Sequence, residues 1–257
     1  MELIYGRNAV SEALKSTRYG AKIEKVMLAE GVEEKAGGPV AQIIELAARR
    51  QPPVPVKKVA RQELDRLTNQ ANHQGVVAQV PPYIYTDFDE LLQANQENPD
   101  ALFLVLDSLQ DPQNLGTLFR TAEAMGVTGV ILPERRAAGV TPAVRNASSG
   151  AVEHLQIAQV VNLARALDQL RETGVWVAGL EDEKKAVPYD KASLTGRLAL
   201  VVGNEGAGLG RLVREKCDFF VSLPMLGKVA SLNAAVAGSI ALYEALRQRR
   251  AATASKK

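Results

Sequence analysis

Three short stretches of this chain place polar side chains where a predicted strand ends and a helix begins. The first is LDSLQDPQNLGTLFRTAEAMGV (106–127), with Asn114 near the predicted helix start and Arg120 inside an otherwise apolar helix. Taken alone, Asn114 reads as a helix cap and Arg120 as a solvated helix residue. Gly116 costs such a helix about 1 kcal/mol relative to alanine. A glycine at this cost suggests that another group approaches the helix backbone closely at Gly116.

The second stretch, LVVGNEGAGLGRLVREKCD (200–218), reads as a strand, a glycine-rich turn and a helix. Gly206, Gly208 and Gly210 are spaced G-x-G-x-G, which differs from the G-x-G-x-x-G of dinucleotide-binding turns, and no G-K-[ST] completes a P-loop. Glu205 would repel a phosphate, so an uncharged or cationic ligand suits this turn. The structural alternative is a tight turn with an exposed acid.

The third stretch, GKVASLNAAVAGSIALYEALRQRR (227–250), begins with Lys228, Ser231 and Asn233 before a long helix of small apolar residues. Ser231 alone reads as a helix cap. However, strand, polar turn and helix now occur three times, and ligands gather at the carboxyl ends of parallel strands. The three turns therefore predict one pocket, lined by Asn114, Arg120, Glu205, Ser231 and Asn233.

The elements that would hold these turns suggest two bodies joined by a linker. Residues 1–80 read as a small α/β unit. Residues 81–100 contain prolines, five acids and no base, as expected for a linker, with a short helix near Phe88–Ala94. In 101–250 strands alternate with helices, which predicts an α/β domain with a largely parallel sheet. A basic tail, 251–257, follows.

Composition narrows the class of protein. The 257 residues are 46% hydrophobic with a net charge of +2, which permits RNA binding without demonstrating it. No run reaches the ~18 apolar residues of a membrane span, and the N-terminus lacks a signal-peptide pattern. The single cysteine, Cys217, excludes an intrachain disulfide and fits a cytoplasmic location. With only His73 and His154 beside it, we expect no metal site.

We assign the remaining conspicuous side chains mainly to structure. Trp176 lies in an apolar strand and is expected in the core. His154 and Cys217 are expected to belong to packing, and His73 to a structural role or an RNA contact.

The three stretches resemble the signature motifs of the SpoU/TrmH family, in the same order and spacing. Members of this family are S-adenosylmethionine-dependent RNA ribose 2′-O-methyltransferases. The matching segments are NLGTLFRTAEAMGV, VVGNEGAGL and LPMLGKVASLNAAVAGSIALYEA, and VRNASSGAVEHL (144–155) resembles the segment between the first two motifs. YGRNAVSEAL and HQGVVAQV resemble the branch with an extra N-terminal RNA-binding domain. That branch includes the enzyme that methylates a guanosine ribose of large-subunit ribosomal RNA.

The resemblance implies a fold and a partner that composition and spacing do not. The methyltransferase domain would carry a C-terminal trefoil knot (an α/β-knot), and the enzyme would be a homodimer with its active site near the subunit interface. S-adenosylmethionine (AdoMet) would bind in the knot, with Gly203, Leu223 and Leu232 contacting its adenosyl part mainly through backbone groups. The other residues implied to shape this pocket are Asn204, Glu205, Gly206, Met225 and Ser231.

The resemblance also gives Arg120 the leading catalytic role. Because a guanidinium is normally fixed in its charged form, we expect Arg120 to position the ribose hydroxyl and an adjacent phosphate. Asn114, Glu205, Ser231 and Asn233 would then hold the ribose and Arg120. In the N-terminal unit the candidate phosphate contacts are Arg7, Lys57, Lys58 and Arg61, each of which alone also reads as a solvated surface charge.

Three other functions stay open at this point. A transfer-RNA ribose methyltransferase would share the motifs, although the extra N-terminal domain favours ribosomal RNA. A non-catalytic RNA-binding protein would not need Asn114, Arg120, Glu205, Ser231 and Asn233 together. A nicotinamide-dependent oxidoreductase is disfavoured by the glycine spacing and the order of the motifs.

Overall fold

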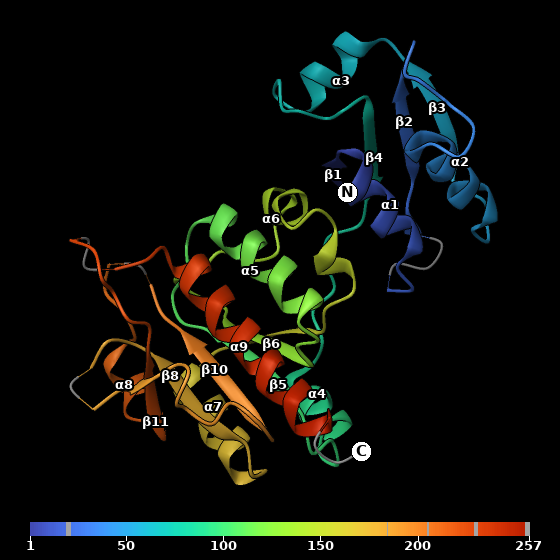
Figure 1. The fold of residues 1–257 in the computed structure, drawn as a ribbon. Coiled ribbons are helices and arrows are strands. Elements are labelled where there is room, and N and C mark those ends of the chain that lie inside the picture. Colours follow the sequence, from blue (N-terminus) through green and yellow to red (C-terminus); the bar gives the residue numbers. More distant parts are fainter. Residues whose placement is uncertain (19–21, 184, 205, 229–230, 255–257) are drawn as a thin grey trace. The chain divides into compact units, whose positions relative to one another are not determined.

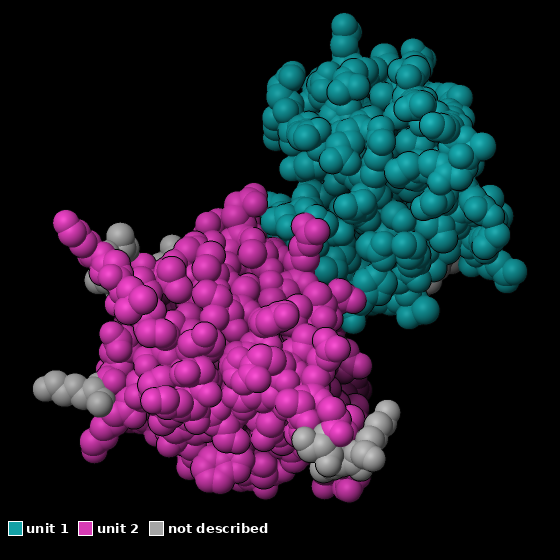
Figure 2. Space-filling model, viewed as in Figure 1, with its two compact units in different colours: residues 1–84, 140–154 teal, residues 85–139, 155–257 magenta. Residues whose placement is uncertain are grey.

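The structure is a computed structural model in which the chain forms two compact units (Figure 2). Unit 1 comprises Met1–Ile84 and Val140–His154, and unit 2 comprises Tyr85–Gly139 and Leu155–Lys257. The residues that the structure describes are 1–18, 22–183, 185–204, 206–228 and 231–254. Glu205, a candidate site residue, therefore lies outside the described residues.

Unit 1 is built on a four-stranded mixed sheet with the order β1-β4-β2-β3. Its strands are β1 (Glu2–Tyr5), β2 (Lys25–Ala29), β3 (Val56–Val59) and β4 (Val76–Val80), and its main helices are α1 (Arg7–Lys15), α2 (Pro39–Arg49) and α3 (Arg61–Leu67). Apolar residues of α1 and α2 pack into one buried cluster with the sheet, and Leu64 of α3 packs into a second one. The small α/β unit predicted from the sequence is confirmed.

The segment 140–154 packs in unit 1, although we expected it inside the methyltransferase domain. It contains α6 (Pro142–Ala147) and a short 3-10 helix (Ala151–Glu153). Arg145 is fully buried and pairs with Glu153 at 2.9 Å and with Glu2 at 3.4 Å. Its guanidinium also donates to the carbonyl of Pro81 at 3.0 Å. Because a buried charge needs such partners, this network fixes the segment to unit 1.

Unit 2 contains a seven-stranded sheet in which each strand is parallel to its neighbours, in the order β7-β6-β5-β10-β8-β11-β9. The strands are β5 (Leu102–Leu106), β6 (Gly129–Pro133), β7 (Ile157–Val160), β8 (Trp176–Leu180), β9 (Val187–Pro188), β10 (Leu198–Val202) and β11 (Phe219–Ser222). The predicted parallel sheet is confirmed, although β7 and β9 were not among the predicted strands. The trefoil knot stays a prediction.

Helices cover both faces of this sheet. Apolar residues of α4 (Phe88–Ala94), α7 (Leu163–Glu172) and α8 (Arg211–Arg214) share one buried cluster with the strands. On the other face α5 (Pro112–Ala124) and α9 (Ala234–Ala254) lie side by side (Figure 1). A Cβ atom on Gly238 would lie 2.7 Å from Leu118 Cδ2. Glycine at this position lets α9 approach α5 closely, which explains one small residue of this helix.

The linker prediction and the structure divide residues 81–100 differently. Helix α4 forms as predicted, but Leu91 is fully buried in the core of unit 2. The helix is begun by Asp87, whose side chain accepts hydrogen bonds from the backbone N–H groups of Asp89 and Glu90. Part of the expected linker is thus packed structure. At the other end of the chain, α9 continues to Ala254, into the expected tail.

Two predicted core residues are on the surface instead. Trp176 is 63% exposed. It is the first residue of β8, so its side chain lies at the end of the sheet where the strand enters. His154 is exposed and its Nε2 lies 2.7 Å from Glu12 Oε2. None of the helices in the described part of the chain has the length and hydropathy needed to cross a bilayer.

Candidate active site

A cavity lies at the carboxyl ends of β8, β10 and β11, where Leu180, Val202 and Val221 help to form its wall. This is the end of a parallel sheet at which ligands bind. The structure brings together six of the predicted cofactor-binding residues in this wall. They are Gly203, Asn204, Leu223, Met225, Ser231 and Leu232.

The glycine-rich turn after β10 forms one side of the cavity. Backbone groups of Asn204 and Gly208 pair with each other in both directions, at 3.1 and 2.9 Å. A Cβ atom on Gly203 would lie 2.5 Å from the carbonyl atoms of Gly208, so only glycine fits there. Gly206, also predicted to bind cofactor, is exposed outside the lining, and its N–H donates to Asn204 Oδ1 at 2.9 Å.

Two polar residues tie this turn to the end of β5. The Asn204 amide donates to the carbonyl of Ser108 at 3.1 Å, and Ser108 has a positive φ of 61°. The carboxylate of Asp107, which is only 7% exposed, accepts a 2.7 Å hydrogen bond from the N–H of Gly210. Sequence reasoning did not single out Asp107. The available signal was an acid placed directly after a continuous apolar strand.

Asn233 joins the first and third motifs. Its Oδ1 accepts hydrogen bonds from the N–H groups of Ala235 and Val236 at 3.0 and 3.2 Å, which makes it the N-cap of α9. Its Nδ2 donates to Oδ1 of Asn114, a buried residue of α5, at 2.9 Å. One side chain thus caps a helix and orients a second candidate residue, next to Ser231 and Leu232 of the cavity wall.

Arg120 is not part of the cavity wall. It is exposed on α5, between Phe119, which is buried, and Thr121, whose hydroxyl pairs with Ser239 of α9 at 2.8 Å. The single chain therefore brings Asn114 and Asn233 together and leaves the Arg120 guanidinium open to a bound partner.

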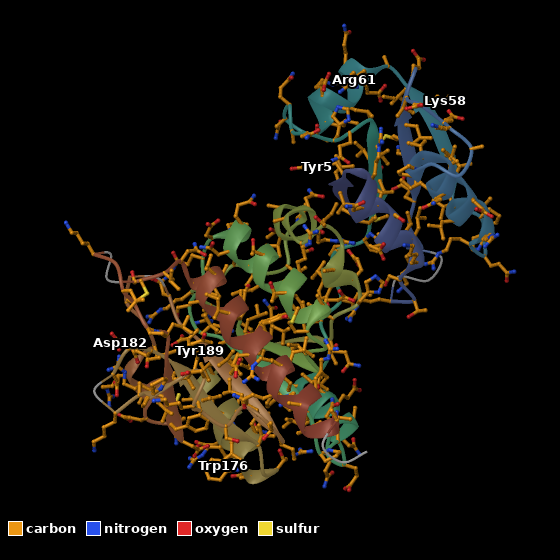
Figure 3. All side chains as sticks on the ribbon, viewed as in Figure 1. Tyr5, Lys58, Arg61, Trp176, Asp182 and Tyr189 are labelled. Atoms are coloured by element: carbon orange, nitrogen blue, oxygen red, sulfur yellow. The ribbon has the colours of Figure 1, made fainter. Side chains whose placement is uncertain are left out.

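The cavity wall also contains two acids that the sequence reasoning missed. Glu181 and Asp182 directly follow β8 and line the cavity. Figure 3 shows Asp182 and Trp176 at opposite ends of the sheet. The signal for the acids was their place immediately after an apolar strand, at its carboxyl end.

The candidate RNA contacts of unit 1 fall into two groups. Arg7 and Arg61 line one polar pocket together with Glu33 and Gln74, where α1 and α3 begin. Arg7 Nε donates to the carbonyl of Gln74 at 3.4 Å.

Lys57 and Lys58 lie on β3, are exposed and are absent from that pocket. Lys58 pairs with Glu34 at 2.8 Å. Figure 3 shows the places of Arg61 and Lys58 in unit 1. His73 is 1% exposed. Its Nδ1 accepts from the N–H of Gly75, and its Nε2 lies 2.9 Å from Asp65. This burial supports the structural role for His73.

Comparison with known proteins gives two family matches along the chain. Residues 101–243 match the SpoU rRNA Methylase family, and residues 3–86 match the family described as RNA 2′-O ribose methyltransferase substrate binding. Together these matches cover both the cavity and the sheet of unit 1.

Individual proteins agree over nearly the whole length. YacO of Bacillus subtilis (strain 168), named as a TrmH family tRNA/rRNA methyltransferase, is 45% identical, with 96% of each chain covered. The AdoMet complex of the SpoU methyltransferase AviRb from Streptomyces viridochromogenes has a TM-score of 0.77 at 27% identity and covers 97% of this chain and 90% of that one. An AdoMet-bound rRNA methyltransferase from Sinorhizobium meliloti has a TM-score of 0.76 at 27% identity and covers 96% and 87%.

The family resemblance that the motifs suggested is therefore confirmed, and so is AdoMet as the methyl donor. This chain belongs to the SpoU rRNA Methylase family and is an AdoMet-dependent RNA 2′-O-ribose methyltransferase of the SpoU/TrmH type.

Proposed function

We propose that this enzyme methylates a guanosine ribose of large-subunit ribosomal RNA, and that the cavity at the ends of β8, β10 and β11 holds AdoMet. The observation that carries the placement is the convergence of two motifs in one cavity wall, with the Asn114–Asn233 hydrogen bond joining the remaining motif to it. The choice of ribosomal RNA rests on unit 1, because the similar rRNA methyltransferase from Sinorhizobium meliloti matches 96% of this chain, unit 1 included.

The residues of the cavity fit AdoMet. Glycine at position 203 lets the backbone of Gly208 pack closely and so shapes this wall, and much of the remaining lining is apolar, which suits a flat adenine ring. Of the lining residues that the structure describes, none is basic, and two are acids, Glu181 and Asp182. AdoMet supplies an electrophilic methyl group on a positively charged sulfur, and an acidic wall suits a cation.

Methyl transfer requires two contributions from this chain, alignment of the reacting atoms and removal of the hydroxyl proton. The ribose 2′-oxygen must approach the methyl carbon in line with the bond to sulfur; as the new C–O bond forms, the C–S bond breaks and its electron pair stays on sulfur. The hydroxyl proton must leave in the same step. We assign Arg120 to holding the hydroxyl and an adjacent phosphate, because its guanidinium is exposed and charged. Asn114, Asn233, Ser231 and Glu205 are assigned to holding the ribose and Arg120.

Unit 1 docks the RNA in this proposal. Arg7 and Arg61 come together because the carboxyl ends of β1, β2 and β3 and the start of β4 meet at one end of the sheet. Two guanidinium groups in one polar pocket suit a phosphodiester, since arginine binds phosphate through paired N–H donors. Lys57 and Lys58, which lie outside this pocket, would attract RNA phosphates more weakly.

The active enzyme is a homodimer in this proposal, and α9 supplies part of its interface. Val236, Ile240 and Tyr243 follow each other at helical spacing and are 45%, 38% and 61% exposed. They line a groove together with Thr117 of α5 and Tyr189. A second copy that covers this α9 face would remove an apolar stripe from water. It would also come close to Arg120, which lies one turn along α5 from Thr117.

The decisive experiment is methyl transfer from labelled AdoMet to unmodified ribosomal and transfer RNA, with Arg120→Ala beside the wild type. Label on a ribose of large-subunit ribosomal RNA, lost in Arg120→Ala, is expected. Arg165→Ala is the matched control, since Arg165 is likewise exposed on a helix of unit 2. Label in transfer RNA alone would overturn the ribosomal substrate. Full transfer by Arg120→Ala would overturn the role of that arginine.

A further inference from the structure

The cavity contains a carboxylate that none of the three motifs accounts for. Glu181 directly follows Leu180, the last residue of β8, and β8 lies between β10 and β11 in the sheet. The side chain is 16% exposed and lines the cavity next to Gly208 of the glycine-rich turn. A nearly buried acid in a ligand cavity requires an explanation, because an isolated carboxylate is costly to remove from water.

One half of this carboxylate is satisfied and the other half is not. Oε1 pairs with Arg214, which also pairs with Glu183 at 2.8 Å. A Cβ atom on Gly208 would lie 2.6 Å from Oε1, so glycine there leaves room for the carboxylate. Oε2 is buried and has no hydrogen-bond partner among the described residues. The position of Glu181 is therefore fixed by Arg214, while one acceptor oxygen stays available.

An unsatisfied buried acceptor at the wall of a cavity calls for a donor on the ligand. Phosphate has no place beside Glu181 and Asp182, so the donor must be a hydroxyl or an amine. The neighbouring wall is apolar at Val202, Val221 and Leu232, which suits the face of a purine base. A ribose attached to that base would carry its hydroxyls toward the polar edge of the cavity.

We propose that Glu181 accepts hydrogen bonds from the ribose hydroxyls of the bound adenosyl group. An acid after a neighbouring parallel strand holds ribose hydroxyls in the same way in doubly wound nucleotide-binding domains. Arg214 acts as the positioning residue that aims the carboxylate. This inference rests on the proposed placement of AdoMet in the cavity.

The test measures binding, without turnover. S-adenosylhomocysteine and its 2′-deoxy and 3′-deoxy analogues are titrated by calorimetry into the wild type, Glu181→Gln and Glu183→Gln. Hydrogen bonds to a charged acceptor are lost in Glu181→Gln, so its affinity for S-adenosylhomocysteine should fall about tenfold to a hundredfold. At least one deoxy analogue should bind the wild type and Glu181→Gln almost equally, because it lacks the group that Glu181 holds. Glu183 pairs with the same arginine, Arg214, but lies outside the cavity wall. Glu183→Gln should therefore bind S-adenosylhomocysteine like the wild type.

Each other result counts against the proposal. Unchanged affinity of Glu181→Gln for S-adenosylhomocysteine would overturn it, and so would an equal loss for the parent compound and both deoxy analogues. A loss confined to AdoMet, with its positive sulfur, would show that Glu181 acts through charge and not through the ribose. If the wild type binds neither AdoMet nor S-adenosylhomocysteine, the proposed placement of AdoMet in the cavity fails together with this inference. If the wild type binds and only the Glu181 effect is missing, the proposed function stands without this inference.

Discussion

The guanidinium of Arg120 is exposed on α5, and its paired N–H donors suit a phosphate and a ribose oxygen at the same time. Lysine keeps the charge but offers a single ammonium group. Arg120→Lys should therefore slow methyl transfer by about tenfold to a hundredfold while AdoMet affinity stays unchanged. Single-turnover transfer and calorimetry measure the two effects separately. Transfer by Arg120→Lys at the wild-type rate would show that charge alone is needed.

Cys217 is a second residue that gives a testable prediction, which concerns the reactivity of its thiol. Burial, followed by the nearby carboxylates of Asp218, Glu181 and Asp107, raises the pKa of this thiol from 9.0 to about 12. At pH 8 the reactive thiolate is then on the order of one molecule in ten thousand. We expect a disulfide reagent such as Ellman's reagent to react slowly with the native protein and rapidly in denaturant. Complete reaction of the native protein within seconds would contradict this.

The raised pKa of Cys217 also makes the free energy of unfolding depend on pH in a defined direction. The folded state holds the thiol proton more tightly than the unfolded chain does, so this contribution is fully present below pH 9.0 and is lost as the pH rises toward 12. In Cys217→Ala the fall in unfolding free energy over that alkaline range should be shallower than in the wild type.

At the scale of elements, Asn233 connects the start of α9 with α5. Asn233→Ser keeps a capping oxygen but is too short to reach Asn114, whereas Asn233→Ala loses both contacts. The alanine variant should lose about 1 kcal/mol of stability, and the serine variant much less. Both should transfer methyl groups more slowly. Thermal melts and transfer rates of the two variants test this, and wild-type transfer by Asn233→Ser would show that the link to Asn114 is dispensable.

The elements of unit 2 could be predicted because their signals are local. A continuous apolar run marked β5, and the polar turns after β10 and β11 led to the residues that line the cavity. Glu181 was missed because its signal, an acid directly after an apolar strand, separates a cavity residue from a surface residue only once the neighbouring strands are known. Trp176 was misplaced because an apolar strand composition does not tell which end reaches solvent.

The assignment of 140–154 to unit 1 was also beyond the sequence. It depends on the pairing of Arg145 with Glu2 and with the carbonyl of Pro81, groups that lie far away along the chain. Pairing between residues so far apart along the chain produces no periodic pattern in the sequence. Arg120 stays a prediction in the same sense, since its proposed partners are the RNA and a second copy of the chain.

For the whole molecule, the buried ion pair of unit 1 predicts a local loss of stability. Arg145 and Glu153 have side chains that are 0% and 1% exposed. Glu153→Gln leaves a buried guanidinium short of its charged partner and should cost about 3 kcal/mol. Hydrogen exchange followed by mass spectrometry should show faster exchange in β1 and β4 and unchanged exchange in β5 and β10. Glu24→Gln, an exposed acid of unit 1, is the control; exchange in Glu153→Gln that matches this control would contradict the prediction.

The proposed homodimer gives a prediction of assembly. The wild type should behave in light scattering as a particle of twice the chain mass of 27.6 kDa. Tyr243→Asp places a charge in the α9 face and should yield the single chain, with transfer activity reduced. Val161→Asp is the matched control, because Val161 is 82% exposed and follows the edge strand β7, whereas α9 packs against α5, β8 and β10. A wild type that is already a single chain would overturn the dimer.

The placement of α6 and Arg145 in unit 1 bears on how such a gene can change. The polypeptide passes from one unit to the other three times, after residues 84, 139 and 154. A deletion of the first 84 codons would leave Val144, Arg145 and Val152 without the residues that bury them, so the product should be prone to aggregate. Unit 1 therefore cannot be removed or replaced as one continuous segment of the chain. Gain or loss of the N-terminal part must be accompanied by rewriting of a stretch in the middle of the reading frame.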